Sequence, residues 1–567
     1  MTKADGADKN SKEKKQKPEK PLAGGQVREV HGSPEHLKGR RFVITSAQNN
    51  TYVHEGFVRA LESYCEKNGA QLVVSKFSYN ANQYRSQNPA AEVDSPELLD
   101  NREKVAHSEI PEASKVKHQW FDPRIEQYYV EKQRFQVADG LQFCSETNIL
   151  PTQVNPFAGY ENYTRGQSGI FPHSTQAMTS LPGMKDVDGA RFLYSTGTCT
   201  QRNYIQRSAG QKADANHIYG ALVVEVDDNG EWFVRQIAAD ENGAFYDLDK
   251  KYMPNGKILE GQRPEAINWG DIHIEKVDPV ALFSSIGPGG MLDTLKPKLQ
   301  VFNDTQDFSH RNHHNLKDPN FWTAEHFSPE KPSVEKGLSL TAQFMKAAER
   351  PEVKSLVVNG NHDEYAFRKW LNEADTRFDP NNRAFWHECN AKLARETEYG
   401  NKDFNVFEWA VREKADLMQT HFLPIDTSYV ICETSKNAGI ELGLHGDIAA
   451  NGAKGSGARS FRNIGMRANI GHTHTAAIFQ GVFVAGTMSK LDMDYNKGPS
   501  SWSHSDILTY PNGKRTIITK RANGKWCLDS QPVDKKQATA LLKDLKKSSE
   551  QALKRGPAGP SPDRKVA

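Results

Sequence analysis

The sequence predicts an α/β protein with two folded domains, and three features of its 567 residues lead to this prediction. First, a chain of this length exceeds what one hydrophobic core supports. Second, residues 42–74 follow a strand, helix, strand pattern, which is typical of a parallel pair of strands. Third, short apolar runs alternate with amphipathic helical stretches between 261 and 530, and polar residues follow each run. This alternation predicts sheets flanked by helices, with functional sites at the carboxyl ends of strands.

The N-terminal α/β domain is expected over residues 41–260. An apolar run at 42–45 is followed by a helical face that includes Phe57 and Leu61, and then by a second apolar run at 72–74. Two further apolar runs, at 221–226 and 232–236, flank an Asp-Asn-Gly turn and predict a hairpin. No motif in this domain indicates a chemistry, so we expect it to bind substrate or to serve as an assembly surface.

The two ends of the chain are basic. Residues 1–40 contain too little apolar surface to offset the entropy of ordering, so a disordered tail is predicted there. Within 531–567, leucines at helical spacing predict a basic helix over 535–555, followed by a disordered tail. The net charge is only +2, so the chain as a whole lacks the field of a nucleic-acid-binding protein, and any such binding must come from local charge.

The composition also bears on location. No apolar run reaches the roughly 18 residues that a membrane-spanning helix needs, so no membrane partner is expected. No apolar segment follows the lysine-rich start, unlike in a secretory signal. Six scattered cysteines predict neither a disulfide framework nor a zinc–thiolate site. We therefore expect a cytoplasmic protein.

Five short segments of the domain expected at 261–530 contain metal-ligand residue types directly after predicted strands. They are Gly270-Asp271-Ile272-His273, Asn303-Asp304-Thr305-Gln306-Asp307, Asn359-Gly360-Asn361-His362-Asp363, Leu444-His445-Gly446-Asp447 and Gly471-His472-Thr473-His474. A spacing of two residues in the first and last segments places both ligands on one side of an extended chain. Two divalent cations about 3.5–4 Å apart would neutralise phosphoryl charge and supply hydroxide near neutral pH. These segments therefore predict a two-metal site for phosphoester hydrolysis.

The order of these motifs resembles that of the calcineurin-like metallophosphoesterases, over about residues 265–490. That superfamily includes protein phosphatases, cyclic-nucleotide phosphodiesterases and nucleases of double-strand-break repair. The resemblance implies a sandwich of two β-sheets flanked by helices. It implies the following metal ligands: Asp271, His273 and His474 for one ion, Asn361, His445 and His472 for the other, and Asp304 as the bridge.

The resemblance also implies two catalytic roles. His362 would donate a proton to the leaving oxygen or stabilise charge in the transition state, and Asp363 would orient His362. Asn303 departs from the family, which usually has glycine there; we expect this to change the turn but not the ligand set. His421 is a rival to His445, which we prefer because an apolar strand precedes it. The role of His310, His313 and His314 stays open between substrate contacts, a decoy set that only resembles metal ligands, and a solvated loop.

A glycine-rich basic segment lies between the fourth and fifth motifs, at 451–462. Its cations are predicted to bind DNA backbone phosphates beside the cleaved bond. With one more arginine downstream, the predicted substrate-binding residues are Lys454, Arg459, Arg462 and Arg467. Phe461 would stack on a base. The alternative is a flexible surface loop without a ligand.

Taken whole, including residues 44–51, the chain resembles the pre-early proteins with which large tailed phages degrade host DNA. This resemblance implies a metal-dependent DNase in the host cytoplasm, with Mn²⁺ favoured over Mg²⁺ or another divalent ion. Its partners would be DNA and, through residues 41–260, further copies of the chain or a host or phage protein. Two alternatives stay open: a phosphomonoesterase, cyclic-nucleotide phosphodiesterase or protein phosphatase of the same superfamily, and a non-catalytic docking protein with a structural metal site.

Overall fold

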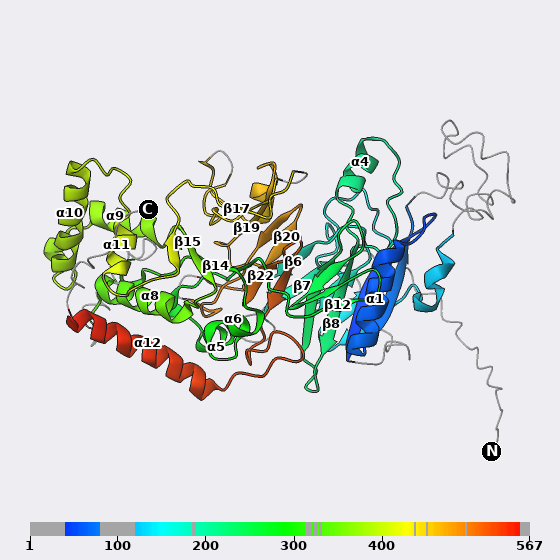
Figure 1. The fold of residues 1–567 in the computed structure, drawn as a ribbon, viewed down its shortest axis with the longest axis horizontal. Coiled ribbons are helices and arrows are strands. Elements are labelled where there is room, and N and C mark those ends of the chain that lie inside the picture. Colours follow the sequence, from blue (N-terminus) through cyan, green and yellow to red (C-terminus); the bar gives the residue numbers. More distant parts are fainter. Residues whose placement is uncertain are drawn as a thin grey trace, which may run out of the picture.

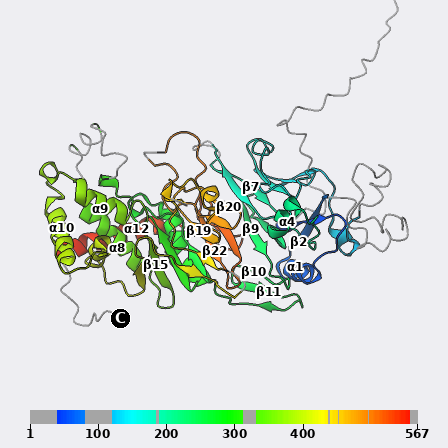
Figure 2. The same ribbon diagram turned by 90° about the horizontal axis from the view of Figure 1, so that it is seen from above.

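The computed structural model describes residues 40–79, 120–183, 189–311, 331–435, 438–449, 452–493 and 496–555, together with Asn320 and Phe327. The protein is a mixed α/β structure in which several sheets are flanked by helices (Figures 1 and 2). The tails predicted to be disordered lie almost entirely outside these residues. Within the described ranges, no helix is long and apolar enough to cross a membrane.

A four-stranded sheet in the order β2-β1-β8-β9 confirms the strand, helix, strand prediction. Its elements are β1 (Arg41–Gln48), α1 (Glu55–Asn68), β2 (Gln71–Phe77), β8 (Gly220–Val226) and β9 (Trp232–Ala238). β1 and β2 are parallel, and β8 and β9 form the predicted antiparallel hairpin. Helix α1 begins where the His54 ring accepts a hydrogen bond from the Phe57 N–H, and it ends at Gly69 in the left-handed conformation. The helix buries Phe57 and Leu61 against the sheet.

A six-stranded sheet in the order β16-β15-β14-β13-β22-β23 forms the core of the region predicted to be catalytic. Its strands are β13 (Ala266–Asn268), β14 (Leu299–Asn303), β15 (Lys354–Val358), β16 (Thr420–Phe422), β22 (Ser505–Thr509) and β23 (Arg515–Thr519). The first four strands of that order are parallel, and β22 and β23 are antiparallel to their neighbours. The parallel strands therefore bring their carboxyl ends to one edge of the sheet.

Helices cover the six-stranded sheet (Figure 1). They are α5 (Pro279–Ile286), α6 (Met291–Leu295), α8 (Val334–Ala348), α9 (Glu364–Glu373), α10 (Arg383–Glu398), α11 (Val406–Arg412) and α12 (Lys535–Arg555). Amphipathic helices between 261 and 530 and the helix over 535–555 were expected, and they are present. Three short 3-10 turns accompany them, namely η6 (Ile274–Lys276), η7 (Ser309–Arg311) and η8 (Thr376–Phe378).

A ten-stranded sheet combines strands from both parts of the chain, in the order β17-β18-β19-β21-β20-β6-β7-β5-β4-β3. Its strands are β3 (Arg134–Ala138), β4 (Leu141–Cys144), β5 (Ser168–Phe171), β6 (Met178–Leu181), β7 (Arg191–Ser195), β17 (Val430–Ile431), β18 (Ile440–Glu441), β19 (Arg467–Ile470), β20 (Ala477–Phe479) and β21 (Val482–Val484). Antiparallel pairing of β6 with β20 joins the two parts. Backbone hydrogen bonding therefore runs across the boundary expected at residue 260, and the role predicted for residues 41–260 stays a prediction.

The remaining elements are short. They are β10 (Phe245–Asp247), β11 (Lys250–Tyr252) and β12 (Ile258–Leu259), which form a three-stranded sheet, and α4 (Ser208–Ala215), η5 (Pro123–Tyr128) and η10 (Ala458–Phe461).

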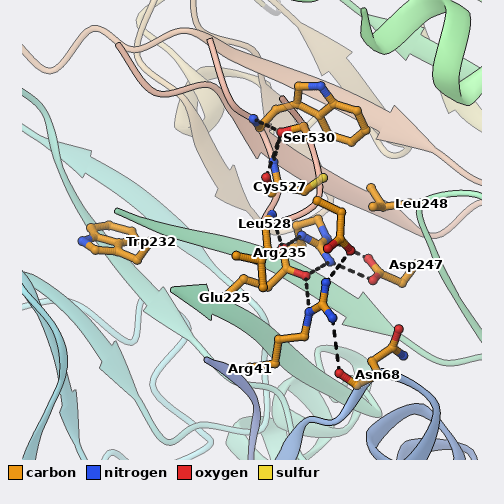
Figure 3. A network of polar contacts seen from close by, with 12 residues as sticks. Arg41, Asn68, Glu225, Trp232, Arg235, Asp247, Leu248, Cys527, Leu528 and Ser530 are labelled. Carbon is orange, nitrogen blue, oxygen red and sulfur yellow. Dashed lines mark hydrogen bonds and ion pairs between the residues drawn. The ribbon is translucent and has the colours of Figure 1, made fainter. Parts of the chain in front are cut away.

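A buried ionic network ties the C-terminal segment to the four-stranded sheet (Figure 3). Arg235 on β9 donates hydrogen bonds to both carboxylate oxygens of Asp247 and to Glu225 on β8, at 2.7–3.3 Å. Glu225 also accepts the backbone N–H of Leu528 at 2.9 Å. Burial alone would raise the pKa of Glu225, but Arg235 and Arg41 lower it to about 2. Glu225 is therefore ionised in the folded protein at neutral pH. The guanidinium of Arg235 balances this buried negative charge.

Candidate metal centre

The five sequence motifs meet at one place, between the carboxyl ends of the six-stranded and ten-stranded sheets. β13, β14 and β15 of the smaller sheet lead directly into the segments that hold Asp271, Asp304 and Asn361. β18 and β19 of the larger sheet are parallel neighbours and lead into His445 and His472. Figure 1 shows β14 and β15 facing the β19 and β20 side of the larger sheet. Each sheet therefore contributes part of one centre.

Asp271, His273 and His474 form the first group of candidate ligands. Their ligand atoms lie within 4.8 Å of one another, and all three residues are buried. The Nε2 atoms of the two histidines are 3.1 Å apart, and His474 Nε2 is 3.2 Å from Asp271 Oδ2. This is the group predicted for the first cation.

Asp304, His445 and His472 form the second group, again with ligand atoms within 4.8 Å. Asn361 joins this group, because its Oδ1 lies 2.9 Å from His472 Nδ1. Asp304 stands between the two groups. Its Oδ2 is 3.0 Å from His445 Nε2 in the second group and 3.9 Å from His273 Nε2 in the first. This is the position expected for a bridging carboxylate.

The electrostatics of the centre favour ionised carboxylates. Burial by itself would raise the pKa of Asp304, but His445 and His362 lower it well below its usual range. Burial opposes protonation of His445 too, yet Asp304 raises the pKa of that ring to about 10. For His472 and His474 burial dominates, and their pKa values are lowered. The ionised carboxylates and the neutral imidazoles of His472 and His474 are donors that divalent transition metals accept, and a cation bound to His445 would have to displace the proton of that ring.

The donor atoms fit a cation for a second reason. Among the residues that the structure describes, Asp271 Oδ1 is buried without a hydrogen-bond partner. Leaving such atoms unsatisfied costs about 1–3 kcal/mol each, and more for a charged group. A cation bound to this aspartate and held between the imidazole nitrogens would offset that cost. The buried His and Asp groups can therefore hold metal ions, and the structure does not specify which metal.

Backbone conformation at the centre is strained. Four of the predicted ligands have positive φ angles although none is glycine: His273 (43°), Asp304 (40°), His472 (71°) and His474 (56°). Such conformations cost of order 1–3 kcal/mol each and cluster at functional sites. The strain is held by local bonds, such as the one from the His472 N–H to Asp271 Oδ2 at 2.7 Å. The protein stabilises an unfavourable backbone in order to aim these side chains.

Two glycines are required by close approach of the carboxylates. A Cβ atom added at Gly360 would lie 2.0 Å from Asp304 Oδ1, and one at Gly471 would lie 2.1 Å from Asp271 Oδ1. Gly360 therefore leaves space for the Asp304 carboxylate, and Gly471 leaves space for that of Asp271.

We expect Gly360→Ala to lower metal affinity, because the new methyl group must displace the Asp304 carboxylate. The affinity for metal should fall at least about tenfold, as is typical when a metal ligand loses its correct position. Equilibrium dialysis with Mn²⁺ measures it. Gly465→Ala is the control, since Gly465 has a φ of 77° but no heavy atom within 4 Å of an added Cβ. Equal metal binding by the Gly360 variant and wild type would contradict the placement of Asp304.

His362 lies beside the first group, and its ring is 4.8 Å from that of His273. The His362 Nδ1 atom is 2.9 Å from the carbonyl oxygen of Asp307, which can only accept a hydrogen bond. This contact fixes the proton on Nδ1 and makes Nε2 the nitrogen that exchanges the second proton. The Asp307 carboxylate in turn lies 3.3 Å from His273 Nδ1. Asp307 therefore positions both rings, a role that the sequence did not reveal.

Asp363 has a different place from the one predicted. Its carboxylate accepts three hydrogen bonds of 2.7–3.1 Å, from the N–H and hydroxyl of Thr305 and from the N–H of Gln306. Burial and the nearby Asp304 charge raise the pKa of Asp363 to about 7. Asp363 thus anchors the loop that carries Asp304, and its influence on His362 is indirect.

Three further residues support the centre. Glu275 accepts the backbone N–H groups of Asp307 and Phe308 at 2.6 and 2.9 Å and so fixes that loop. Asn303, the departure from the family pattern, has its Oδ1 3.3 Å from His445 Nδ1 and helps to orient that ring. The ring of Trp502 lies 4.2 Å from the ring of His474. No motif marks Glu275 or Trp502, because their positions depend on contacts remote in sequence.

The structure also distinguishes the competing histidines. His445 is buried within the second group, whereas His421 is exposed on β16. His310 is half-buried in η7. His313 and His314 lie outside the described residues.

The basic segment after the fourth motif lies against the centre. A Cβ added at Gly455 would be 1.7 Å from the carbonyl oxygen of Gly446, the residue after His445. Lys454, Arg459 and Arg462 are exposed on this segment. Three of the four residues predicted to bind substrate are therefore exposed, and Lys454 is next in sequence to the glycine that packs on Gly446.

Two residues that were predicted to contact DNA, Phe461 and Arg467, have structural roles within the protein instead. Phe461 is buried in a small core with Ile470 and Val484, so it is not placed to stack on a base. Arg467 begins β19, at the end of the strand opposite to His472, and donates to the carbonyl oxygens of Gly439 and Gly513. Its guanidinium satisfies these backbone groups, which gives it a structural role.

The fold and the centre together define a class: an α/β protein with a buried histidine and aspartate centre for metal ions where two sheets meet. The chain is 36% identical over 518 residues to Protein A1 of Escherichia phage T5, across 90% of this chain and 86% of the phage protein. It belongs to the family of that phage protein. No known protein-family model matches the chain, and no solved structure matches it.

Proposed function

We propose that the protein is a metal-dependent phosphodiesterase that hydrolyses DNA, with the calcineurin-like arrangement of two metal sites. The single observation that carries the proposal is the position of Asp304. One of its oxygens lies within 4 Å of histidines from both ligand groups. A carboxylate shared by two histidine-rich groups is the arrangement that a two-metal hydrolytic site requires.

The residues of the centre can be assigned separate roles in hydrolysis. Asp271, His273 and His474 would hold one cation, Asn361, His445 and His472 the other, and Asp304 both. Two such cations, when bound, neutralise charge on the phosphoryl oxygens and make hydroxide available near neutral pH. His362 would pass a proton from Nε2 to the leaving oxygen, with its ring held by the Asp307 carbonyl. Asp307 would at the same time keep the His273 ring in place.

DNA is the substrate favoured by the surroundings of the centre. Lys454, Arg459 and Arg462 are exposed on a segment that packs on Gly446, next to the second ligand group. Exposed cations flanking the centre suit a polymer with a phosphate on each side of the cleaved bond. The relative is a phage protein, and on that basis we place the activity in the cytoplasm of the infected cell, with host DNA as the proposed substrate. Mn²⁺ is the cation that we propose, because it accepts mixed nitrogen and oxygen ligands.

Linear and circular DNA, each incubated with Mn²⁺, Mg²⁺ or EDTA, test the proposal. We expect hydrolysis with Mn²⁺ and none with EDTA. Bis-p-nitrophenyl phosphate and p-nitrophenyl phosphate, assayed in parallel, separate a phosphodiesterase from a phosphomonoesterase. Cleavage of the monoester alone, with intact DNA, would replace this proposal with a phosphatase.

We expect His362→Gln to retain metal binding but to slow turnover by roughly 10²–10⁴, the range for loss of a general acid. Its ring nitrogens are not needed for either ligand group as proposed. Single-turnover hydrolysis and metal content, measured on the same preparation, check this result. A parallel loss of bound metal would instead make His362 a metal ligand, together with its neighbours Asp307 and His273.

A further inference from the structure

Helix α12 (Lys535–Arg555) has two unlike faces. On one face, Leu545 is buried and Leu541 and Leu542 are partly buried against the core that includes α5 and α8. The Ser339 hydroxyl on α8 donates to the carbonyl oxygen of Ser549 at 3.0 Å, which fixes the last turns of the helix. Figure 1 shows α12 along the outer side of α8 and α5. The opposite face therefore points away from the protein.

Lysines predominate on that outward face, and the exposed Glu550 is the acid among them. The exposed lysines of the helix are Lys535, Lys536, Lys543, Lys546, Lys547 and Lys554. At 3.6 residues per turn these positions fall within a sector of about 120°, centred away from Leu541 and Leu545. Within the part of the chain that the structure describes, none of them has a carboxylate within 4 Å. We call this set the lysine face of α12.

Contacts through α8 connect the last turns of α12 with a loop of the metal centre. Near the end of α12, Glu550 is 4.0 Å from Lys336 on α8. The next residue, Gly337, packs so closely that an added Cβ would lie 2.8 Å from Glu275, which holds the loop of Asp307. The last turns of α12 are thus only a few side chains from the centre. At 1.5 Å per residue, the lysines span about 28 Å along the helix.

We propose that the lysine face of α12 binds the phosphate backbone of duplex DNA and leads it toward the metal centre. This inference rests on the proposed function and adds a second contact surface to it. Duplex DNA presents one charge per about 1.7 Å of its axis, so a track of about 28 Å meets several phosphates. Lysine side chains contact phosphates as flexible point charges, so the binding is independent of base sequence.

The test compares two triple variants with equal loss of charge. Lys543, Lys546 and Lys547 are replaced by Gln in one, and the exposed and dispersed Lys212, Lys257 and Lys402 in the other. Binding to a duplex is measured by fluorescence anisotropy in EDTA, at several salt concentrations. Each lost phosphate contact lowers the slope of log K against log salt by about 0.9, so the α12 variant should lose about 2.7. At 0.1 M salt its affinity should fall at least about tenfold.

The control triple variant should bind DNA with the slope of wild type, and an unchanged slope in the α12 variant would overturn the inference. So would an equal loss of slope in both variants, since only net charge would then matter. Hydrolysis of bis-p-nitrophenyl phosphate, too small to reach α12, is measured for all three proteins with Mn²⁺. It should be equal in all three. Its absence from wild type would overturn the proposed function, and the binding data would still decide whether α12 contacts DNA.

Discussion

Replacing Asp304 by Asn is expected to abolish hydrolysis of DNA and of bis-p-nitrophenyl phosphate. Asn has about the volume of Asp. It keeps an oxygen that can accept a hydrogen bond from the backbone N–H of His362, which in the wild type donates to Asp304 Oδ1 at 3.1 Å. It removes the negative charge that lies within 4 Å of His273 and His445. Because one change weakens both ligand groups, the loss should exceed the roughly 10²–10³ that removal of one electrostatic contact costs. Rates at saturating Mn²⁺ and the metal content of the purified protein measure it.

The matched control is Asp227→Asn, at a carboxylate that is also buried and that pairs with Lys525 at 2.8 Å away from the centre. We expect that variant to keep its metal and its activity. Activity of the Asp304 variant within a few-fold of wild type would reject the two-metal arrangement. Loss of one metal only would instead assign Asp304 to a single site.

The largest loss of stability is expected from Arg235→Met. Arg235 is 2% exposed and makes four hydrogen bonds to Glu225 and Asp247 (Figure 3). Met fills a similar volume but leaves two carboxylates buried with fewer partners. Breaking a buried ion pair from one side costs about 3–5 kcal/mol, so the free energy of unfolding should fall by that amount. Urea denaturation followed by circular dichroism measures the change.

Arg40→Met serves as the control, because Arg40 pairs with Asp228 while both side chains are more than half exposed. An exposed pair contributes about 0–1 kcal/mol. If both variants changed stability by the same small amount, the buried network would not tie the C-terminal segment to the sheet. Addition of Glu225→Gln and Asp247→Asn to the Arg235 variant should recover part of the loss, since the unpaired charges are then gone.

Much of the fold was predictable where a pattern is local. The strand at 42–45, the hairpin around Gly230 and the helix at 535–555 are confirmed because apolar periodicity and turn residues lie within a few positions of one another. The strands between 134 and 195 were not predicted. They are four or five residues long, most of their residues are buried, and alternation is therefore weak. Their partners, such as β20, are far along the chain.

The sequence by itself determined the candidate ligands, because each motif places metal-binding side chains within a few residues of a strand end, and four of the five motifs also contain a glycine. Only the tertiary structure decided which supporting residues serve them. It placed Asp307 between two histidines, gave Asp363 to the loop of Thr305, and turned Phe461 and Arg467 inward. The physical reason is that a ligand motif is a local conformation, whereas burial and hydrogen-bond partners depend on which distant strands pack together.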